Sequence, residues 1–191
     1  MKKYFLTYGD EKFKYSKIHL IELAKKSKFF DEFISLGPDD LNEDFKIKFS
    51  DILLSKRGGG YWIWKHEIVS RLLNDINNND IVFYCDAGSS INLSKKANKR
   101  FIDYLNIIQD PEITFLRFEA EKKFLENLYT TKEIFNAFDI ALNSDIRQTT
   151  QLQAGVMFFK KNKISLSLLN DYKEVLYNDP ELITDKYSEN Q

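Results

Sequence analysis

The sequence is poor in the residues that stabilise secreted domains and zinc-bound folds. Its 191 residues include one cysteine, Cys85, and two histidines. One cysteine cannot form an internal disulfide, and it excludes a zinc site made of four cysteines. This usage suits a reducing compartment, so we expect a cytoplasmic protein.

Long apolar runs are missing as well. None approaches the roughly 20 residues that a membrane-spanning helix needs. The N-terminal residues MKKYFLTYGD form a segment that is too short and too polar for a secretory signal. We therefore expect no transmembrane segment.

Neither sign of charge is in excess. Lysine and arginine total 28 against 29 aspartates and glutamates, a formal net charge of −1. This balance gives no support to broad electrostatic binding of nucleic acid or of a membrane surface, and we expect no nucleic-acid partner. Hydrophobic residues make up 43% and charged residues 30%, a mixture typical of a globular protein. The length fits one domain over residues 1–191.

Strand-like segments alternate with helical ones along the chain. Apolar runs and helical spacing predict strands at 4–8, 29–36, 81–85, 112–118 and 154–162, and helices at 15–27, 44–56, 61–76, 93–108 and 164–177. The run IVFYC at 81–85 is continuously apolar, which predicts a central strand buried on both faces. The alternation predicts an α/β fold, a mostly parallel sheet flanked by helices.

Two of these strands end in small or acidic residues, at 7–10 and at 84–88. In open α/β sheets, ligands bind beyond the carboxyl ends of the strands. A carboxylate such as Asp86 is a natural ligand for Mg²⁺ or Mn²⁺, which in turn holds a diphosphate. The alternative is that Asp86 only starts a turn, with Gly88 in a left-handed conformation.

The segment RGGGYWIWK (57–65) contains three of the seven glycines and both tryptophans. Arg57 and Lys65 flank glycines whose N–H groups, beside a helix start, can hold an anion. Trp62 and Trp64 can cover a base or a sugar, although tryptophans at a helix start also serve as core anchors. The spacing is not that of a P-loop or of a dinucleotide-binding fingerprint.

Three segments together resemble GT-A fold glycosyltransferases. IVFYCDAG (81–88) resembles the apolar strand followed by Tyr-x-Asp-x-Asp, whose acidic pair holds a divalent ion in that family. QLQAGVMFFKKN (151–162) is similar to the strand that contacts the donor sugar. RGGGYWIWK resembles a block in polysaccharide-assembling glycosyltransferases of bacteria and large DNA viruses. The segments occur in the family's order, and the resemblance extends to about residue 175.

The resemblance implies a single GT-A-like domain with a Rossmann-like sheet. It also implies transfer of a hexose from a nucleotide-diphosphate sugar, a UDP-hexose, to a glycan or other hydroxyl acceptor. Asp86 would be the catalytic residue and the ligand of Mn²⁺ or Mg²⁺. The residues 7–10 would receive the base and ribose, 57 and 65 the phosphates, and 153–155 the sugar. The full donor-binding set is Thr7, Tyr8, Gly9, Asp10, Arg57, Trp64, Lys65, Tyr84, Cys85, Ala87, Gly88, Gln153, Ala154 and Gly155.

The sequence departs from the family at several positions. Gly88 stands where the second acid is expected, and Gln153 replaces the usual asparagine. A C-terminal histidine ligand is missing: His19 is expected to be structural, and His66 lies either near the donor or on the surface. With Asp86 as the one acid, we expect the ion and the nucleotide to bind with positive, reciprocal coupling.

Other assignments stay open at this level. Glu119, Glu121 and Asp145 are equal candidates for the base that an inverting reaction needs. A phosphotransfer enzyme of the haloacid-dehalogenase type, with Asp86 as nucleophile, is a competing class, although it also requires an acid at position 88. A non-catalytic nucleotide-binding module is a third. The ending SENQ, directly after a helical stretch, is compatible with a fragment of a longer chain.

Overall fold

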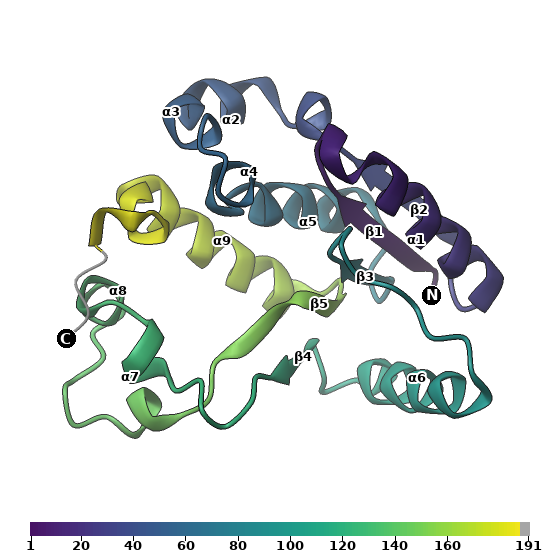
Figure 1. Cartoon of the computed structure of the whole chain (residues 1–191). Helices are drawn as coiled ribbons and strands as arrows, with labels where there is room; N and C mark the ends of the chain where they lie inside the picture. Colours follow the sequence, from purple (N-terminus) through teal and green to yellow (C-terminus); the bar gives the residue numbers. More distant parts are fainter. Residues whose placement is uncertain (188–191) are drawn as a thin grey trace.

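The computed structural model of the protein describes residues 1–187, so the SENQ ending lies outside the described residues. It contains a five-stranded sheet with the strand order β2-β1-β3-β5-β4 (Figure 1). The strands are β1 (Lys3–Tyr8), β2 (Glu32–Leu36), β3 (Ile81–Cys85), β4 (Phe115–Glu119) and β5 (Leu152–Lys160). Over these 187 residues, no helix is both long and apolar enough to cross a membrane.

The sheet is only partly parallel, which corrects the expectation of a mostly parallel one. β1 pairs in parallel with β2 and β3, whereas β5 is antiparallel to both of its neighbours, β3 and β4. The physical reason lies in the connection between β4 and β5. Glu119 pairs with Leu152, so the chain leaves β4 and enters β5 at the same edge of the sheet. A connection that returns at the same edge produces an antiparallel pair, while a parallel pair needs a crossover.

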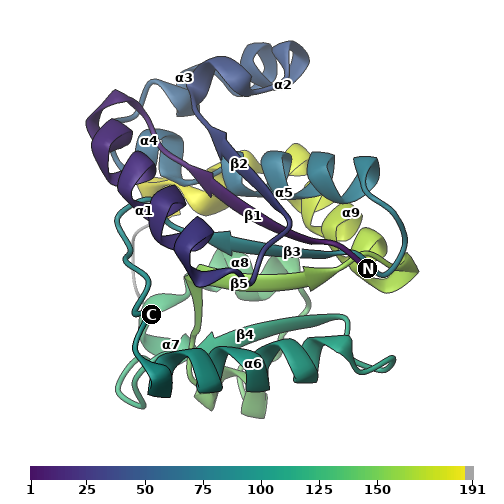
Figure 2. The ribbon, with the colours of Figure 1, turned by 90° about the vertical axis from the view of Figure 1, so that its right-hand side faces the viewer.

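Helices cover both faces of the sheet, as the α/β pattern predicts. α5 (Trp64–Asp75) and α9 (Lys163–Asn178) bury their apolar sides against Leu6, Val82 and Tyr84. On the other face, α1 (Lys14–Ser27) and α6 (Lys95–Gln109) cover a second core. Figure 2 looks onto a face of the sheet and shows its strands side by side in the order β2-β1-β3-β5-β4 from top to bottom. All five residues of β3 are buried, because alternate side chains enter the two cores, and the expected central strand is confirmed.

Several short elements connect the layers. They are η1 (Glu11–Phe13), η2 (Pro38–Asp40), α2 (Glu43–Lys48), α3 (Ser50–Leu53), α4 (Gly58–Tyr61), α7 (Glu126–Tyr129), α8 (Lys132–Ala137), η3 (Asp145–Gln148), η4 (Pro180–Ile183) and η5 (Asp185–Tyr187). The single helix expected at 44–56 is thus two helices. Phe49 separates them with non-helical backbone angles, and its ring is buried in the first core.

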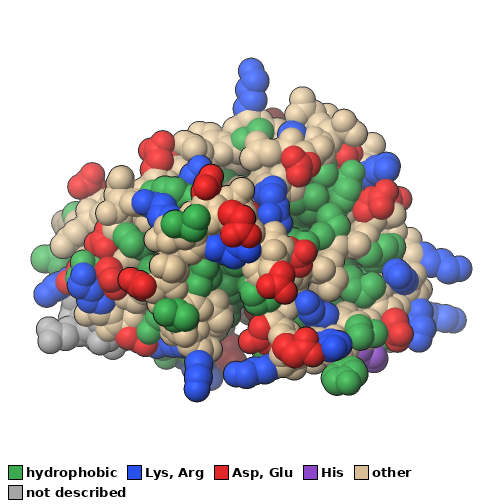
Figure 3. Space-filling model, turned by 90° about the horizontal axis from the view of Figure 1, so that it is seen from above, with side chains coloured by type: hydrophobic (Ala, Val, Ile, Leu, Met, Phe, Trp, Pro, Cys, Tyr) green, Lys and Arg blue, Asp and Glu red, His purple; other side chains and the backbone are tan. Residues whose placement is uncertain are grey.

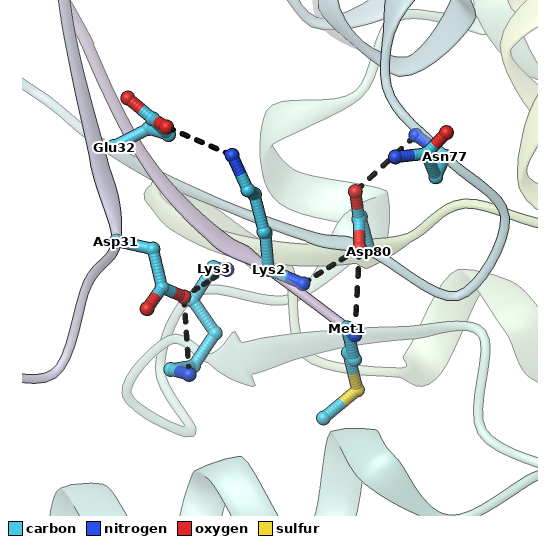
Figure 4. A network of polar contacts seen from close by, with 7 residues as sticks. All are labelled: Met1, Lys2, Lys3, Asp31, Glu32, Asn77 and Asp80. Atoms are coloured by element: carbon cyan, nitrogen blue, oxygen red, sulfur yellow. Dashed lines mark hydrogen bonds and ion pairs between the residues drawn. The ribbon is translucent and has the colours of Figure 1, made fainter.

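Polar contacts tie the amino ends of the strands together (Figure 4). Asp80, just before β3, accepts hydrogen bonds from the backbone N–H groups of Lys2 (2.6 Å) and Asn77 (3.2 Å). Asp31, just before β2, accepts one from the N–H of Lys3 (2.7 Å). These contacts fix the start of β1 between its two partners, and they leave the opposite edge of the sheet to the loops that form the site.

Candidate functional site

A cleft of about 800 Å³ opens at the carboxyl ends of β1 and β3. Tyr8 and Asp10 line it from the end of β1, and Asp86 from the end of β3. Its other walls are α2, α3 and residues 58–62, which we call the glycine turn. Because β1 and β3 are parallel neighbours, their two loops meet at one edge, which is where the sequence predicted a ligand.

Asp86 both starts a turn and faces the cleft. Its carbonyl accepts a hydrogen bond from the N–H of Ser89 (2.9 Å), and its own N–H donates to Gly155 O (2.8 Å) on β5. The carboxylate is 37% exposed and accepts a hydrogen bond from the Tyr84 hydroxyl. The two interpretations of Asp86 therefore coexist, although Gly88 has no left-handed conformation.

Lys65 joins Asp86 to the neighbouring strand. Its Nζ lies 2.9 Å from Asp86 Oδ1 and donates to Ala154 O at 2.9 Å. The ammonium also lies 5.2 Å from the centre of the Tyr84 ring. Only 14% of the Lys65 side chain is exposed. The first turn of α5 therefore places a cation at the point where β3 and β5 meet.

The predicted sugar-binding residues of β5 adjoin this pair in different ways. Gly155 lies against the carboxylate, since a Cβ added there would come within 3.2 Å of Asp86 Oδ2. Ala154 contributes the carbonyl that Lys65 contacts. The side chain of Gln153 turns toward β4, where its amide donates to Glu119 O at 3.1 Å.

The two tryptophans have separate environments. Trp64 is buried and stacks on Tyr8 with ring centres 3.8 Å apart, and its Nε1–H donates to Gly58 O at 2.9 Å. Burial raises the pKa of the Tyr8 hydroxyl, so Tyr8 stays neutral in this stack. Both tryptophans line the cleft, and Trp62 is 45% exposed. Trp64 thus combines a core position with the predicted place at the cleft, whereas Trp62, which the donor-binding set did not name, is the more exposed of the two.

The glycine turn explains the three consecutive glycines. Gly58 to Trp62 all have positive φ, so these five residues form a left-handed turn. A Cβ at Gly58 would lie 2.4 Å from the Trp62 ring, and one at Gly60 2.9 Å from Leu53 Cα. Left-handed backbone costs a residue other than glycine about 1–2 kcal/mol, a cost that Tyr61 and Trp62 bear. Glycine avoids that cost at Gly59, and the close contacts require it at Gly58 and Gly60.

Two of the three glycine N–H groups that were expected to hold an anion donate hydrogen bonds within the chain. Gly59 donates to Lys56 O at 3.5 Å, and Gly60 donates to Ser55 O at 2.9 Å. The turn therefore shapes the wall of the cleft, and its bonded N–H groups are not aimed at a ligand.

Arg57, expected at the phosphates, is directed elsewhere. Its guanidinium pairs with Asp185 of η5, which also accepts a hydrogen bond from the Tyr61 hydroxyl (2.9 Å). Other cations line the cleft in its place: Lys12, Lys46 and Lys56. Lys12 follows the first predicted strand, and Lys46 and Lys56 lie in the helix predicted at 44–56. No spacing in the sequence distinguished these lysines as ligand-binding residues. Figure 3 shows that basic and acidic side chains are interspersed on the face seen from above.

Two predicted donor-binding residues, Thr7 and Cys85, are buried on the far side of the sheet from Tyr84. Burial raises the pKa of the Cys85 thiol to about 11, which keeps it protonated. His66, expected near the donor or on the surface, is instead buried between α5 and α9, with Nε2 2.6 Å from Leu169 O. His19 is exposed on α1, which does not fit the expected structural role.

A second cavity of about 410 Å³ lies between the end of β4, the start of β5 and α8. Glu119 and Glu126 line it together with apolar side chains that include Phe138. Of the three candidate bases, Glu119 is the one on its wall. Glu121 is paired with Lys123 (2.8 Å), and Asp145 lies at the exposed start of η3.

A divalent ion has a poor set of ligands here. Residues 1–187 contain no group of three or more His, Cys, Asp or Glu side chains that could hold a metal. Asp86 is a single carboxylate and already faces the ammonium of Lys65. Hard cations such as Mg²⁺ need several oxygen ligands, so the side chains present do not fit a resident ion.

Comparison with known proteins identifies the kind of fold. No protein-family model matches the sequence, and no curated protein sequence matches it. Among solved structures, the chain is similar to a glycosyltransferase involved in the glycosylation of the major capsid of PBCV-1. The TM-score is 0.53 at 12% sequence identity, over 94% of this chain and 68% of that one. The fold is therefore an α/β fold similar to that of a glycosyltransferase.

Proposed function

We propose that the protein is a glycosyltransferase that moves a hexose from a nucleotide-diphosphate sugar, a UDP-hexose, to a glycan or other hydroxyl acceptor. The observation that carries this proposal is the Lys65–Asp86 pair, whose aspartate lines the cleft beyond β1 and β3. The GT-A-like motifs of the sequence meet at this pair, in a fold similar to that of a glycosyltransferase.

The diphosphate would lie over the end of β3. Negative charge develops on the leaving diphosphate as the sugar departs, and fixed cations near that position lower the barrier. Lys65 is the most firmly held cation there, and Lys12 and Lys56 stand on the cleft wall. The exposed ring of Trp62 and the loop after Tyr8 offer a stacking face and polar backbone groups to the nucleoside.

The acceptor would enter from the second cavity. Its apolar wall suits the face of a sugar ring, and its carboxylates suit hydroxyl groups. Glu119 is the candidate base that we favour, because it stands on that wall at the end of β4, one strand away from Gly155 on β5 and two strands away from Asp86 after β3. A base must come within hydrogen-bond reach of the attacking hydroxyl.

The expected Mn²⁺ or Mg²⁺ remains a prediction. Such an ion would supply positive charge to the diphosphate, but one ion-paired carboxylate is a weak anchor for it. No step proposed for this protein depends on the ion.

The site argues against one competing class, and an activity measurement separates the other. A phospho-aspartate mechanism needs a free nucleophilic carboxylate and a second acid two residues on, whereas Asp86 is ion-paired and position 88 is glycine. A non-catalytic nucleotide-binding module would keep the same cleft. It would bind nucleotide sugars without hydrolysing or transferring them.

A thermal-shift screen of nucleotide sugars, with and without manganese, tests the proposal. We expect one UDP-sugar to raise the melting temperature selectively, and to release UDP when acceptor glycans are added. Asp86→Asn should abolish the shift, while Asp103→Asn, at an exposed position on α6, should leave it intact. If no nucleotide or nucleotide sugar stabilises the wild-type protein, the proposal is wrong.

A further inference from the structure

We propose that the ammonium of Lys65, and no divalent ion, is the cation that binds the nucleotide diphosphate, and that Asp86 positions this ammonium. The inference rests on the proposed function and concerns the same cleft. It predicts that nucleotide binds equally well with and without a divalent metal. The family motif at Asp86 had predicted the opposite, that the ion and the nucleotide bind with positive coupling.

The position of the ammonium is fixed from three elements. α5 carries Lys65, the carboxylate of Asp86 follows β3, and Ala154 O belongs to β5. Both oxygens lie 2.9 Å from Nζ. A lysine ammonium has three donors, so these two contacts leave one for a ligand. The backbone acceptor cannot rotate away, because β5 pairs with β3 as far as Val156 and Cys85.

The surroundings of Asp86 favour a lysine over a metal ion. Oδ1 already accepts from Lys65 and from the Tyr84 hydroxyl, and Oδ2 packs beside Gly155. An ion at Oδ2 would approach an ammonium of the same sign without the second carboxylate of the motif to compensate for the repulsion. Gly88 stands at the position where that second carboxylate would be.

The cleft supplies further positive charge without a metal. Lys12 and Lys56 line it, and within residues 1–187 neither Nζ forms an ion pair. A nucleoside diphosphate bound between them and Lys65 would meet three cations. Lysine contributes a point charge to phosphate, so the orientation of each ammonium matters less than its distance from the phosphate.

Removal of Lys65 gives the inference its sharpest test. In Lys65→Met the carboxylate of Asp86 loses its counter-ion and becomes available to a metal. We therefore expect the variant to acquire a manganese dependence that the wild type lacks. In the double variant Lys65→Met/Asp86→Asn, the carboxylate at the end of β3 is also removed, and that dependence should vanish.

Calorimetry of UDP with the full chain, in EDTA and in manganese, measures these effects. We expect the wild-type Kd to agree within about twofold between the two buffers. In EDTA, Lys65→Met should weaken UDP at least tenfold, and manganese should restore part of the loss. The matched control is Lys99→Met, at an exposed position on α6, which should bind like the wild type in both buffers.

Two results would overturn the inference. If manganese tightens UDP tenfold or more for the wild type, a metal bridge is used, and the proposed function stands. If the wild type binds no nucleotide in either buffer, the inference and the proposed function both fail. Melting curves test whether Lys65→Met folds. If it does not fold, Lys65→Arg replaces it, because this variant keeps the charge and should bind UDP in EDTA. The comparison of wild-type UDP affinity in EDTA and in manganese is decisive in either case.

Discussion

Two aspartates stand at opposite ends of β3, and their partners differ in kind. Asp80, at the amino end, has a side chain that is 4% exposed, and its oxygens accept hydrogen bonds from backbone N–H groups. Asp86, at the carboxyl end, is 37% exposed and contacts the side chains of Lys65 and Tyr84. A carboxylate bound by backbone holds the fold together, whereas one bound by side chains at a cleft is available for ligand binding.

The largest effect is expected from Asp80→Ala. The substitution leaves the N–H groups of Lys2 and Asn77 without an acceptor, at a cost of about 3 kcal/mol in the free energy of unfolding. Urea denaturation measures this cost. Asp80→Asn keeps one acceptor oxygen and should cost less. Nucleotide affinity should stay unchanged in both variants, and a loss of affinity with intact stability would reverse the assignment of the two aspartates.

Gly58→Ala should destabilise the protein by about 2 kcal/mol, because its Cβ meets the Trp62 ring and its φ is +59°. Gly88→Ala is the matched control at the same edge of the sheet. Its Cβ would meet only Phe13 Cε1, at 3.6 Å, and its φ is not left-handed. Urea denaturation should therefore find Gly88→Ala within about 0.5 kcal/mol of the wild type. Equal losses at both glycines would contradict a left-handed turn.

Asp86→Asn should change stability by less than about 1 kcal/mol, because the ion pair that it removes is partly exposed to solvent. Its effect should be on binding, with UDP weakened when measured by calorimetry. Unfolding of this variant would mean that Asp86 is as structural as Asp80.

The smallest effect concerns His66, which follows Lys65 directly in the chain but belongs to the core. Burial lowers the pKa of its imidazole in the folded state, so the neutral form is the one that stabilises the fold. Its contribution is complete above the unfolded pKa of about 6.5 and declines as the pH falls below it. Urea denaturation at pH 7.5 and pH 5.5 should show a smaller loss for His66→Gln than for the wild type. An equal loss in both proteins would exclude His66 as the titrating group.

Part of this arrangement follows from the sequence. The continuous apolar run of β3 predicts its central place, and the acid that follows it predicts a site at the sheet edge. The direction of β5 could not be predicted from the sequence. It depends on whether residues 120–151, which connect β4 to β5, bring the chain back to the sheet at the edge where β4 ends or at the opposite edge. Arg57 pairs with a residue 128 positions away. Lys12, Lys46 and Lys56 line one cleft because α2, α3 and the segment that follows them form its wall opposite the end of β1. Such contacts depend on tertiary placement, which local patterns do not encode.

The left-handed turn also sets the rotational phase of α5. An α-helix rotates by about 100° per residue, so a deletion or insertion of one residue between Gly58 and Ile63 would turn the start of α5 by that angle. Lys65 would then leave Asp86, and Trp64 would leave Tyr8. The length of this segment is therefore as constrained as its composition. The turn can tolerate some single substitutions, but it cannot tolerate the gain or loss of one residue.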